Sequence, residues 1–329
     1  METQTYHLHE IPVIFHTDDA ILTHRLRRYW RAFRGNDDSR TSALHIHLQV
    51  SDAPPARPDL PVASFGPEVT YFLEGQRLVI LYHNWARFDV QLDKDVVHGV
   101  MLPQVARHSG AVEDMILIAL APLLRRRGYF TLHAFAAARD GRALLLLGDI
   151  GAGKTTTGLS LLANGAQLVA NDSPLLRIDE TGQPQLFAYP GLISAYPDSL
   201  AYFPEIQARL HAAEPHKGEG KLSFAADDIW PDAWAWQARP AALLFPQITP
   251  GLEESRLEPI SAFQALQYMV GQSLEDWDKA TIPAHLRAIR QLTASAPAYR
   301  LLLAPDVSRL PQLLMPLFDG SLADGQTSS

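Results

Sequence analysis

The residues of this chain with the clearest chemical potential form a glycine-rich loop. Directly after four leucines come three glycines, a lysine and a threonine: Gly148, Gly151, Gly153, Lys154 and Thr155. Their spacing fits the phosphate-binding pattern G-x-x-x-x-G-K-[ST] at every position. Glycines let backbone N–H groups turn toward phosphate oxygens without interference from a Cβ atom. The loop is therefore predicted to bind phosphate.

The context of the motif favours a phosphate loop over a chance glycine-rich turn. The leucine run predicts a buried strand, residues 156–163 predict a helix, and Asn164-Gly165 supplies its stop. Lys154 would reach the outer phosphates of a nucleotide, the helix start would add positive partial charge, and Thr155 would help to hold Mg²⁺. The residues predicted to bind the nucleotide are Gly148, Asp149, Ile150, Gly151, Ala152, Gly153, Lys154, Thr155 and Thr156.

A histidine upstream of the loop is a candidate for handling a proton. Asp140-Gly141 lies between two apolar runs, including the strand predicted at 131–138, and predicts a tight hairpin. Pairing the two strands outward from this turn puts His133 opposite Gly148. There it could contact a phosphate or a carboxylate engaged in proton transfer. A structural histidine at a strand end is an equally good interpretation.

An asparagine and an aspartate follow the next predicted strand, at 167–170. In phosphate-loop enzymes an acid at such a strand end holds Mg²⁺ or accepts the nucleophile's proton. Its place beside the loop favours this role for Asp172, and we predict Thr155 and Asp172 as metal ligands. The alternative is that the pair caps a turn, which Asn and Asp both favour.

Together these motifs resemble the catalytic domain of the HPr kinase/phosphorylase family. The resemblance rests on His133, the loop at 148–155 and residues 165–172, and is closest to the related enzymes of peptide biosynthetic clusters, such as lasso-peptide kinases. It covers about residues 111–320 and is tight over 131–176. It implies an α/β domain of the HPr-kinase type with a mixed sheet. It also implies a kinase that uses ATP and Mg²⁺ to phosphorylate a hydroxyl, such as a serine of a peptide or small protein.

One position departs from the family pattern. The family's first aspartate, its acid/base, falls on Asn171, and only the second is kept, as Asp172. Asparagine cannot take a proton, so either Asp172 or His133 would serve as base, or the chemistry is changed or weakened. A non-catalytic nucleotide-binding regulatory protein and a small-molecule kinase on the same scaffold are the alternatives. Phosphoryl transfer depends mainly on positioning and charge, so we favour the kinase.

Several other features are weaker. Lys217 and Lys221 lie in an apparent glycine-containing loop and are candidates for contacting substrate. His45 and His47 share one face of a predicted strand, but no acidic partner is visible, so we predict no metal there. The basic residues of the first helix are interpreted as a solvated face: Arg25, Arg27, Arg28, Arg31 and Arg34.

The elements that position these residues suggest two domains. We predict a mixed α+β N-terminal domain over 1–110 for substrate selection, the phosphate-loop domain over 111–320 and a flexible tail over 321–329. The first contains a predicted helix at 21–33 and strands at 44–50, 69–73, 77–82 and 88–92. A helix at 112–127 opens the second, and a strand at 298–304 and a helix at 308–318 close it.

Composition narrows the functional classes further. The chain has no cysteine, which excludes thiol catalysis and disulfides. Its net charge of −8 argues against a broad nucleic-acid surface. The start of the sequence lacks a secretory pattern and no apolar run is long enough to span a membrane, so we expect a cytoplasmic protein without a membrane partner. The family resemblance permits a homo-oligomer.

Overall fold

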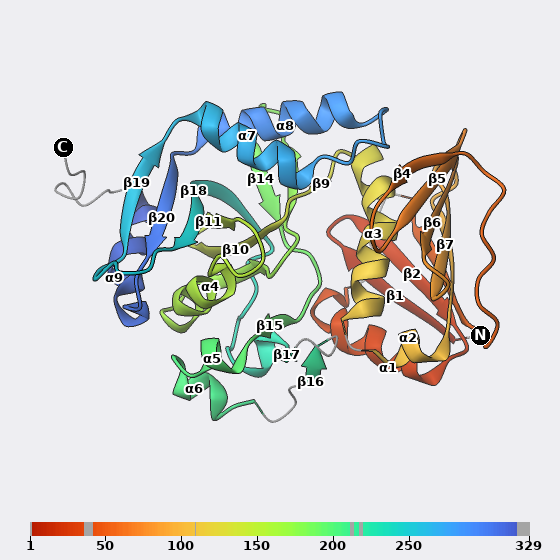
Figure 1. Cartoon of the computed structure of the whole chain (residues 1–329), viewed down its shortest axis with the longest axis horizontal. Helices are drawn as coiled ribbons and strands as arrows, with labels where there is room; N and C mark the ends of the chain where they lie inside the picture. The colour runs from red at the N-terminus through yellow and green to blue at the C-terminus, as the bar shows by residue number, and fades with distance from the viewer. Residues whose placement is uncertain (1, 36–41, 109, 211–213, 217–219, 321–329) are drawn as a thin grey trace. The chain divides into compact units, whose positions relative to one another are not determined.

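The computed structural model describes residues 2–35, 42–108, 110–210, 214–216 and 220–320 (Figure 1). The chain divides into two compact units. The first comprises Met1–Arg127 and Glu275–Ala280, and the second comprises Gly128–Leu274 and Thr281–Ser329. The predicted tail at 321–329 lies outside the described residues.

The first unit is built on an eight-stranded sheet of order β1-β2-β3-β8-β7-β6-β5-β4. Its strands are β1 (Glu2–Leu8), β2 (Ile11–Thr17), β3 (Leu44–Val50), β4 (Val62–Phe65), β5 (Thr70–Glu74), β6 (Arg77–Tyr82), β7 (Ala86–Gln91) and β8 (Val96–Met101). The pairs β2–β3 and β3–β8 are parallel and the others antiparallel. The predictions located β3, β5, β6 and β7 and missed β1, β2, β4 and β8.

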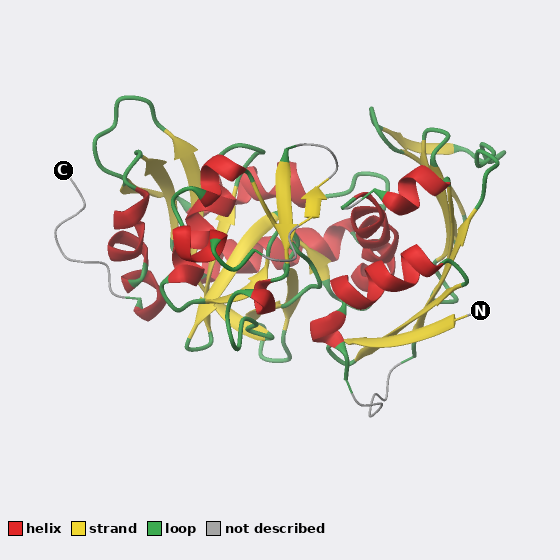
Figure 2. Ribbon diagram, turned by 90° about the horizontal axis from the view of Figure 1, so that it is seen from below, coloured by secondary structure: helices red, strands yellow, loops and turns green. Residues whose placement is uncertain are grey.

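Helices of the first unit lie against one face of this sheet (Figures 1 and 2). They are α1 (Ala20–Tyr29), α2 (Pro103–Arg107) and α3 (Ala111–Arg126). The helix predicted at 21–33 ends at Tyr29 and continues as the 3-10 turn Arg31–Phe33. Trp30, fully buried, meets the ring of Phe15 edge-on at 5.2 Å. Aromatic packing between α1 and β2 thus forms the centre of this core.

The helix that we predicted to open the second domain belongs to the first unit, so a boundary near residue 110 is too early. Glu113 of α3 is buried and accepts a hydrogen bond from Arg25 of α1 at 3.2 Å. At the other end, Arg125 donates to the buried Asp278 at 2.9 Å. These ion pairs tie both ends of α3, and the segment Glu275–Ala280, into the first unit.

The second unit contains a nine-stranded mixed sheet. Its main order is β12-β10-β11-β18-β14-β13-β9, and β20 pairs with both β18 and β19. The strands are β9 (Phe130–Thr131), β10 (Ala134–Arg139), β11 (Arg142–Leu147), β12 (Gln167–Ala170), β13 (Leu175–Ile178), β14 (Pro184–Phe187), β18 (Gln237–Ile248), β19 (Arg256–Ile260) and β20 (Ala298–Leu303). The pairs β11–β18 and β18–β20 are parallel.

Helices cover both faces of this sheet (Figure 1). On one side lie α4 (Lys154–Ala163), α9 (Leu310–Leu314) and α10 (Pro316–Asp319), and on the other α7 (Ala262–Ser273) and α8 (Ile282–Ser295). Along β11, Leu144 and Leu146 join one core while Leu145 and Leu147 join the other. A strand buried on both faces explains the leucine run, and the unit is a mixed α/β structure.

A small three-stranded sheet completes the second unit, with order β15-β17-β16. It contains β15 (Ile193–Ala195), β16 (Glu214–His216) and β17 (Lys221–Phe224), and two short helices lie beside it, α5 (Pro197–Leu200) and α6 (Pro204–Gln207). Lys221 therefore begins a strand, contrary to the predicted loop. Lys217 lies outside the described residues.

Two predicted elements are interrupted. The strand predicted at 131–138 is split into β9 and β10, with Leu132 and His133 between them. The helix predicted at 308–318 is divided into the 3-10 turn Val307–Arg309, α9 and α10. Pro311 and Pro316 occupy the first turns of α9 and α10, and a proline cannot donate the hydrogen bond that would continue the preceding helix.

Candidate functional site

The glycine loop joins β11 to α4 as the sequence predicts. Gly151 has φ of +84° and Gly153 has φ of +100°, a region that favours glycine. A Cβ at Gly153 would lie 2.5 Å from Cδ1 of Leu303, so that side chain would have to shift. The loop therefore has the left-handed backbone and the crowded surroundings that explain its glycines.

Lys154 turns back into this loop. Its Nζ donates to the carbonyl oxygen of Gly148 at 2.5 Å and to that of Asp149 at 3.1 Å. Burial lowers the pKa of the Lys154 ammonium, and the charges of Asp172 and Asp149 oppose that shift. The ammonium is thus held over the loop by carbonyl groups, which a phosphate could replace as a stronger, charged partner.

His133 lies where the hairpin register predicts. Asp140 and Gly141 form the turn with φ of +51° and +75°, and Ala134 pairs with Leu147, so His133 falls level with the start of the loop. Its Nε2 is 3.5 Å from Nζ of Lys154. Burial, followed by the charge of Lys154, lowers the pKa of His133 below its ordinary value of 6.5. The imidazole is therefore neutral at about pH 7 and can accept a proton.

Asn171 and Asp172 follow the end of β12 and differ strongly in exposure. Asn171 is buried and Asp172 is exposed, and the Asn171 amide donates to the Asp172 carboxylate at 2.5 Å. Oδ1 of Asn171 is buried with no hydrogen-bond partner among the described residues. The charge of Asp172 also acts on both His133 and Lys154. These polar groups are therefore gathered beside the loop.

The two threonines at the start of α4 have different surroundings. Oγ1 of Thr156 donates to Oγ of Ser199 at 2.9 Å, which ties α4 to α5. Thr155 is half-buried. Among the described residues, no group of three or more His, Cys, Asp or Glu side chains could hold a metal ion. A metal at this site would need ligands from a bound substrate in addition to protein groups.

A hollow of about 430 Å³ lies along the glycine loop, and sequence reasoning missed most of its lining. It includes Ile150 from the loop, Tyr268 and Gln272 from α7, and Arg300 from β20. Gln272 donates to the Asp149 carboxylate at 3.3 Å. These residues are far apart in the sequence and belong to no motif, so no local signal could have brought them together.

Lys221 approaches the site from the small sheet. Its Nζ lies 5.1 Å from the ring centroid of Tyr196, a cation–π distance. Its positive charge also contributes to the lowered pKa of Lys154. Of the two lysines predicted to contact substrate, Lys221 therefore lies near enough to Lys154 for the two positive charges to interact.

The interpretation of the arginines on the first helix as a solvated face is wrong for Arg25, whose side chain is only 14% exposed. Arg25 pairs with Glu113 and Arg27 pairs with Glu2, so two of the basic residues already have acidic partners within their own unit.

The comparisons with known proteins include a weak structural similarity. No protein-family model matches the sequence, and no curated protein matches it significantly. Among solved structures, the Hpr(Ser) kinase/phosphatase from Coxiella burnetii is similar to this chain at 18% identity and a TM-score of 0.30, over 58% of this chain and 88% of that one. So low a score does not establish a shared fold. None of the helices that the structure describes is long and apolar enough to cross a membrane.

Proposed function

We propose that this chain is an ATP- and Mg²⁺-dependent kinase that phosphorylates a hydroxyl, with a serine of a peptide or small protein as acceptor. The observation that carries the proposal is the gathering at the glycine loop of three side chains picked out by sequence, those of Lys154, His133 and Asp172. The loop follows β11 with glycine-specific geometry, Lys154 lies over it, and His133 and Asp172 interact with that lysine.

The loop would bind the triphosphate. Backbone N–H groups at the start of α4 would donate to phosphate oxygens, where the helix dipole adds positive potential. Lys154 would exchange the carbonyls of Gly148 and Asp149 for oxygens of the outer phosphates. Ile150, which is 83% exposed, and Tyr268 border the hollow beside the loop and would contact the nucleoside.

The residues present fit a Mg²⁺ ion that is shared with the nucleotide. Magnesium in such sites takes one or two protein ligands together with phosphate oxygens and waters. Thr155 and Asp172 would be those ligands. The unpartnered Oδ1 of Asn171 is a further oxygen acceptor in the same place. The bound ion would neutralise charge on the transferring phosphoryl group.

The acceptor hydroxyl would lose its proton to Asp172 or His133 as its oxygen bonds to the γ-phosphorus and the bond to ADP breaks. Asp172 is exposed, and the lowered pKa of His133 leaves that imidazole neutral. Asn171 can orient Asp172 through their hydrogen bond but cannot accept the proton. Asp172 or His133 would then take the proton in place of the aspartate that the HPr kinase/phosphorylase family carries where this chain has Asn171.

Lys221 would contact the substrate, from the strand that brings its charge near Lys154. The first unit would select the acceptor. The cytoplasmic location, the peptide acceptor and a homo-oligomeric state are retained as predictions from the sequence.

Phosphopeptide mass spectrometry tests the proposal. The full chain is incubated with Mg-ATP and with the serine-containing peptides encoded by neighbouring genes. We expect a phosphoryl mass gain on a serine with the wild type, and none with Lys154→Ala. ATP binding without transfer to any peptide or to water-soluble metabolite hydroxyls would contradict the kinase.

That contradicting result would favour a nucleotide-binding regulatory protein as the second candidate. The asparagine at position 171 is the specific observation for it, because loss of the acid/base is expected in a chain that binds nucleotide without turnover. In that case Lys154→Ala would still weaken ATP binding, which separates failure of catalysis from failure of the phosphate loop.

A further inference from the structure

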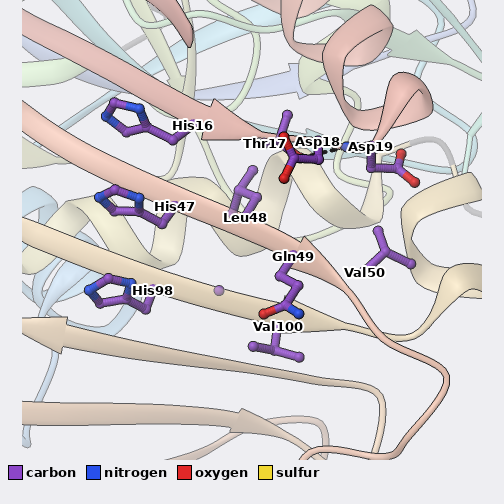
Figure 3. Close-up of a pocket in the computed structure, with 11 residues that line it drawn as sticks. His16, Thr17, Asp18, Asp19, His47, Leu48, Gln49, Val50, His98 and Val100 are labelled. Atoms are coloured by element: carbon purple, nitrogen blue, oxygen red, sulfur yellow. Dashed lines mark hydrogen bonds between the residues drawn. The ribbon is translucent and has the colours of Figure 1, made fainter. Parts of the chain in front are cut away.

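Three histidines stand side by side on the more exposed face of the sheet in the first unit. His16 of β2 pairs with His47 of β3, and His47 pairs with His98 of β8. Because these strands are parallel and in register, the rings stack at centroid distances of 4.4 and 4.8 Å (Figure 3). We call these three residues the histidine row.

The histidine row lines a hollow of about 590 Å³. Asp18, Asp19, Gln49 and Val100 also line it, as Figure 3 shows. A hollow of this size has room for a small ligand and its water shell. All of its lining residues belong to the first unit, and none of them belongs to the glycine loop.

The ring nitrogens of the row are unequally occupied. His16 is held on both sides, by Thr3 Oγ1 at Nδ1 and by His45 Nδ1 at Nε2, each at 3.3 Å. Its ring and that of His45 are nearly parallel with centroids 5.6 Å apart, which fits an edge-to-edge N–H···N bond. The rings of His47 and His98 have no hydrogen-bond partner among the described residues. Their nitrogens are therefore available to a ligand.

Among the described residues, none of the neighbouring carboxylates forms an ion pair with the row. Asp89 of β7 lies opposite His98, but its carboxylate already accepts from Arg77 at 2.9 Å and from Arg87 at 2.7 Å. At the other end of the hollow, Asp19 caps α1 by accepting from the backbone N–H of Leu22. Asp18 lies beside it and also borders the hollow.

Protonation of the row is held back by its own surroundings. Burial, followed by the neighbouring histidines, lowers the pKa values of His16 and His47. A bound anion would oppose the effects of burial and of the neighbouring histidines. Its negative charge would stabilise the protonated rings and reduce the repulsion between them. Anion binding and proton uptake are therefore coupled in this geometry.

We propose that the histidine row is a proton-coupled site for a tetrahedral dianion of the phosphate class, with His47 and His98 donating the hydrogen bonds. A dianion matches the charge of two protonated rings. A metal ion, the other common ligand of imidazoles, fits the geometry poorly. Lone pairs in parallel ring planes do not converge on one point at the ~2.1 Å that metals require, and no metal-holding group of three or more ligands occurs among the described residues.

Sulfate is a suitable probe because it remains a dianion at about pH 5–8, the range over which histidine titrates. Histidine ring NMR on the full chain reports each imidazole separately, so sulfate bound at the glycine loop does not interfere. We expect saturable shifts of the His47 and His98 signals below about pH 6. Because both rings are protonated in the complex, binding takes up two protons, and it should weaken by up to about a hundredfold for each pH unit once both free rings are neutral.

Variants supply the second readout. His47→Gln and His98→Gln should each remove the saturable sulfate response from the remaining row, while His24→Gln, at an exposed position on α1, should leave it intact. In the wild type, sulfate should raise the pKa of His47, which burial and the neighbouring histidines lower in the free protein.

Three results with sulfate, and a fourth with Zn²⁺, would overturn the proposal. The sulfate results are the absence of a saturable shift at low pH, binding with no pH dependence, and a response of His24 equal to that of the row. Stoichiometric Zn²⁺ binding at neutral pH that blocks the sulfate response would instead make the row a metal site and would equally refute it.

Discussion

Replacing Gly153 by alanine tests whether the conformation of the glycine loop is needed for nucleotide binding. At φ of +100° an alanine is strained by about 1–2 kcal/mol. Its Cβ would also lie 2.5 Å from Leu303 Cδ1, and displacing that side chain adds about 1 kcal/mol. We therefore expect the free energy of unfolding to fall by about 2–3 kcal/mol.

Gly165→Ala is the matched control, because Gly165 has φ of +90° and nothing within 4 Å of a built Cβ. It should lose the backbone part alone, about 1–2 kcal/mol. Denaturant unfolding with and without Mg-ATP measures both quantities. Mg-ATP should stabilise Gly165→Ala as much as the wild type and should stabilise Gly153→Ala little.

A double-mutant cycle with Leu303 tests how much of the loss in stability comes from the contact between the new Cβ and the Leu303 side chain. In a double-mutant cycle, Leu303→Ala should remove the crowding, so Gly153→Ala should cost about 1 kcal/mol less in that background. Full Mg-ATP stabilisation of Gly153→Ala, or equal losses for the two glycine variants, would refute the reasoning.

Three further predictions concern the site and the first unit. Asn171→Asp should raise the rate of peptide-dependent ADP formation by up to about 10²-fold, since it adds a base; an unchanged rate would mean that the site works without one. Because the pKa of His133 is lowered, kcat/KM should be constant above about pH 6.5 and fall below it as the ring protonates, and His133→Gln should flatten that fall if the ring is the base. Asp278→Asn should cost about 3 kcal/mol of unfolding free energy by leaving Arg125 buried and unpaired, and a loss below about 1 kcal/mol would contradict this. Burial raises the pKa of Asp278, but bonds from Arg126 and the charge of Arg125 outweigh this and lower it, so the stabilisation should be complete above pH 3.8 and disappear as the pH falls through the lowered value.

The hairpin and the strand before the glycine loop could be predicted because their signals are local. Asp140-Gly141 specifies a turn with two positive φ angles, and the turn fixes the register that brings His133 level with Gly148. The run of four leucines is short and lies between a tight turn and a glycine loop, which favours a strand buried on both faces over a helix. Most of the candidate site follows from these two features and the motif itself.

Two of the four missed strands, β1 and β8, have a polar residue or a glycine where an apolar residue is expected. In β1, Gln4 is buried because it donates to the Thr23 carbonyl and accepts from Tyr6. In β8, the position of Gly99 faces the core, and the side chains of Phe88 and Leu48 fill the space that a larger residue there would occupy. Period-2 hydrophobicity is broken at both places, so the pattern does not predict a strand.

The boundary of the units depended on contacts between distant segments. Asp278 binds Arg125 across 153 positions of sequence, and nothing in the local composition marks residues 275–280 as part of the first unit. The hollow beside the glycine loop also depends on distant segments, because Tyr268 and Arg300 reach it from separate elements.

Calorimetric titration of Mg-ATP into the wild type and Lys154→Ala tests the central claim most directly. Loss of the charge-assisted bonds from this ammonium should weaken binding by about tenfold to a hundredfold, while Lys94→Ala, at an exposed site in the first unit, should bind as the wild type does. Equal affinity of Lys154→Ala and the wild type for Mg-ATP would contradict a phosphate-binding role for the loop and, with it, the proposed kinase.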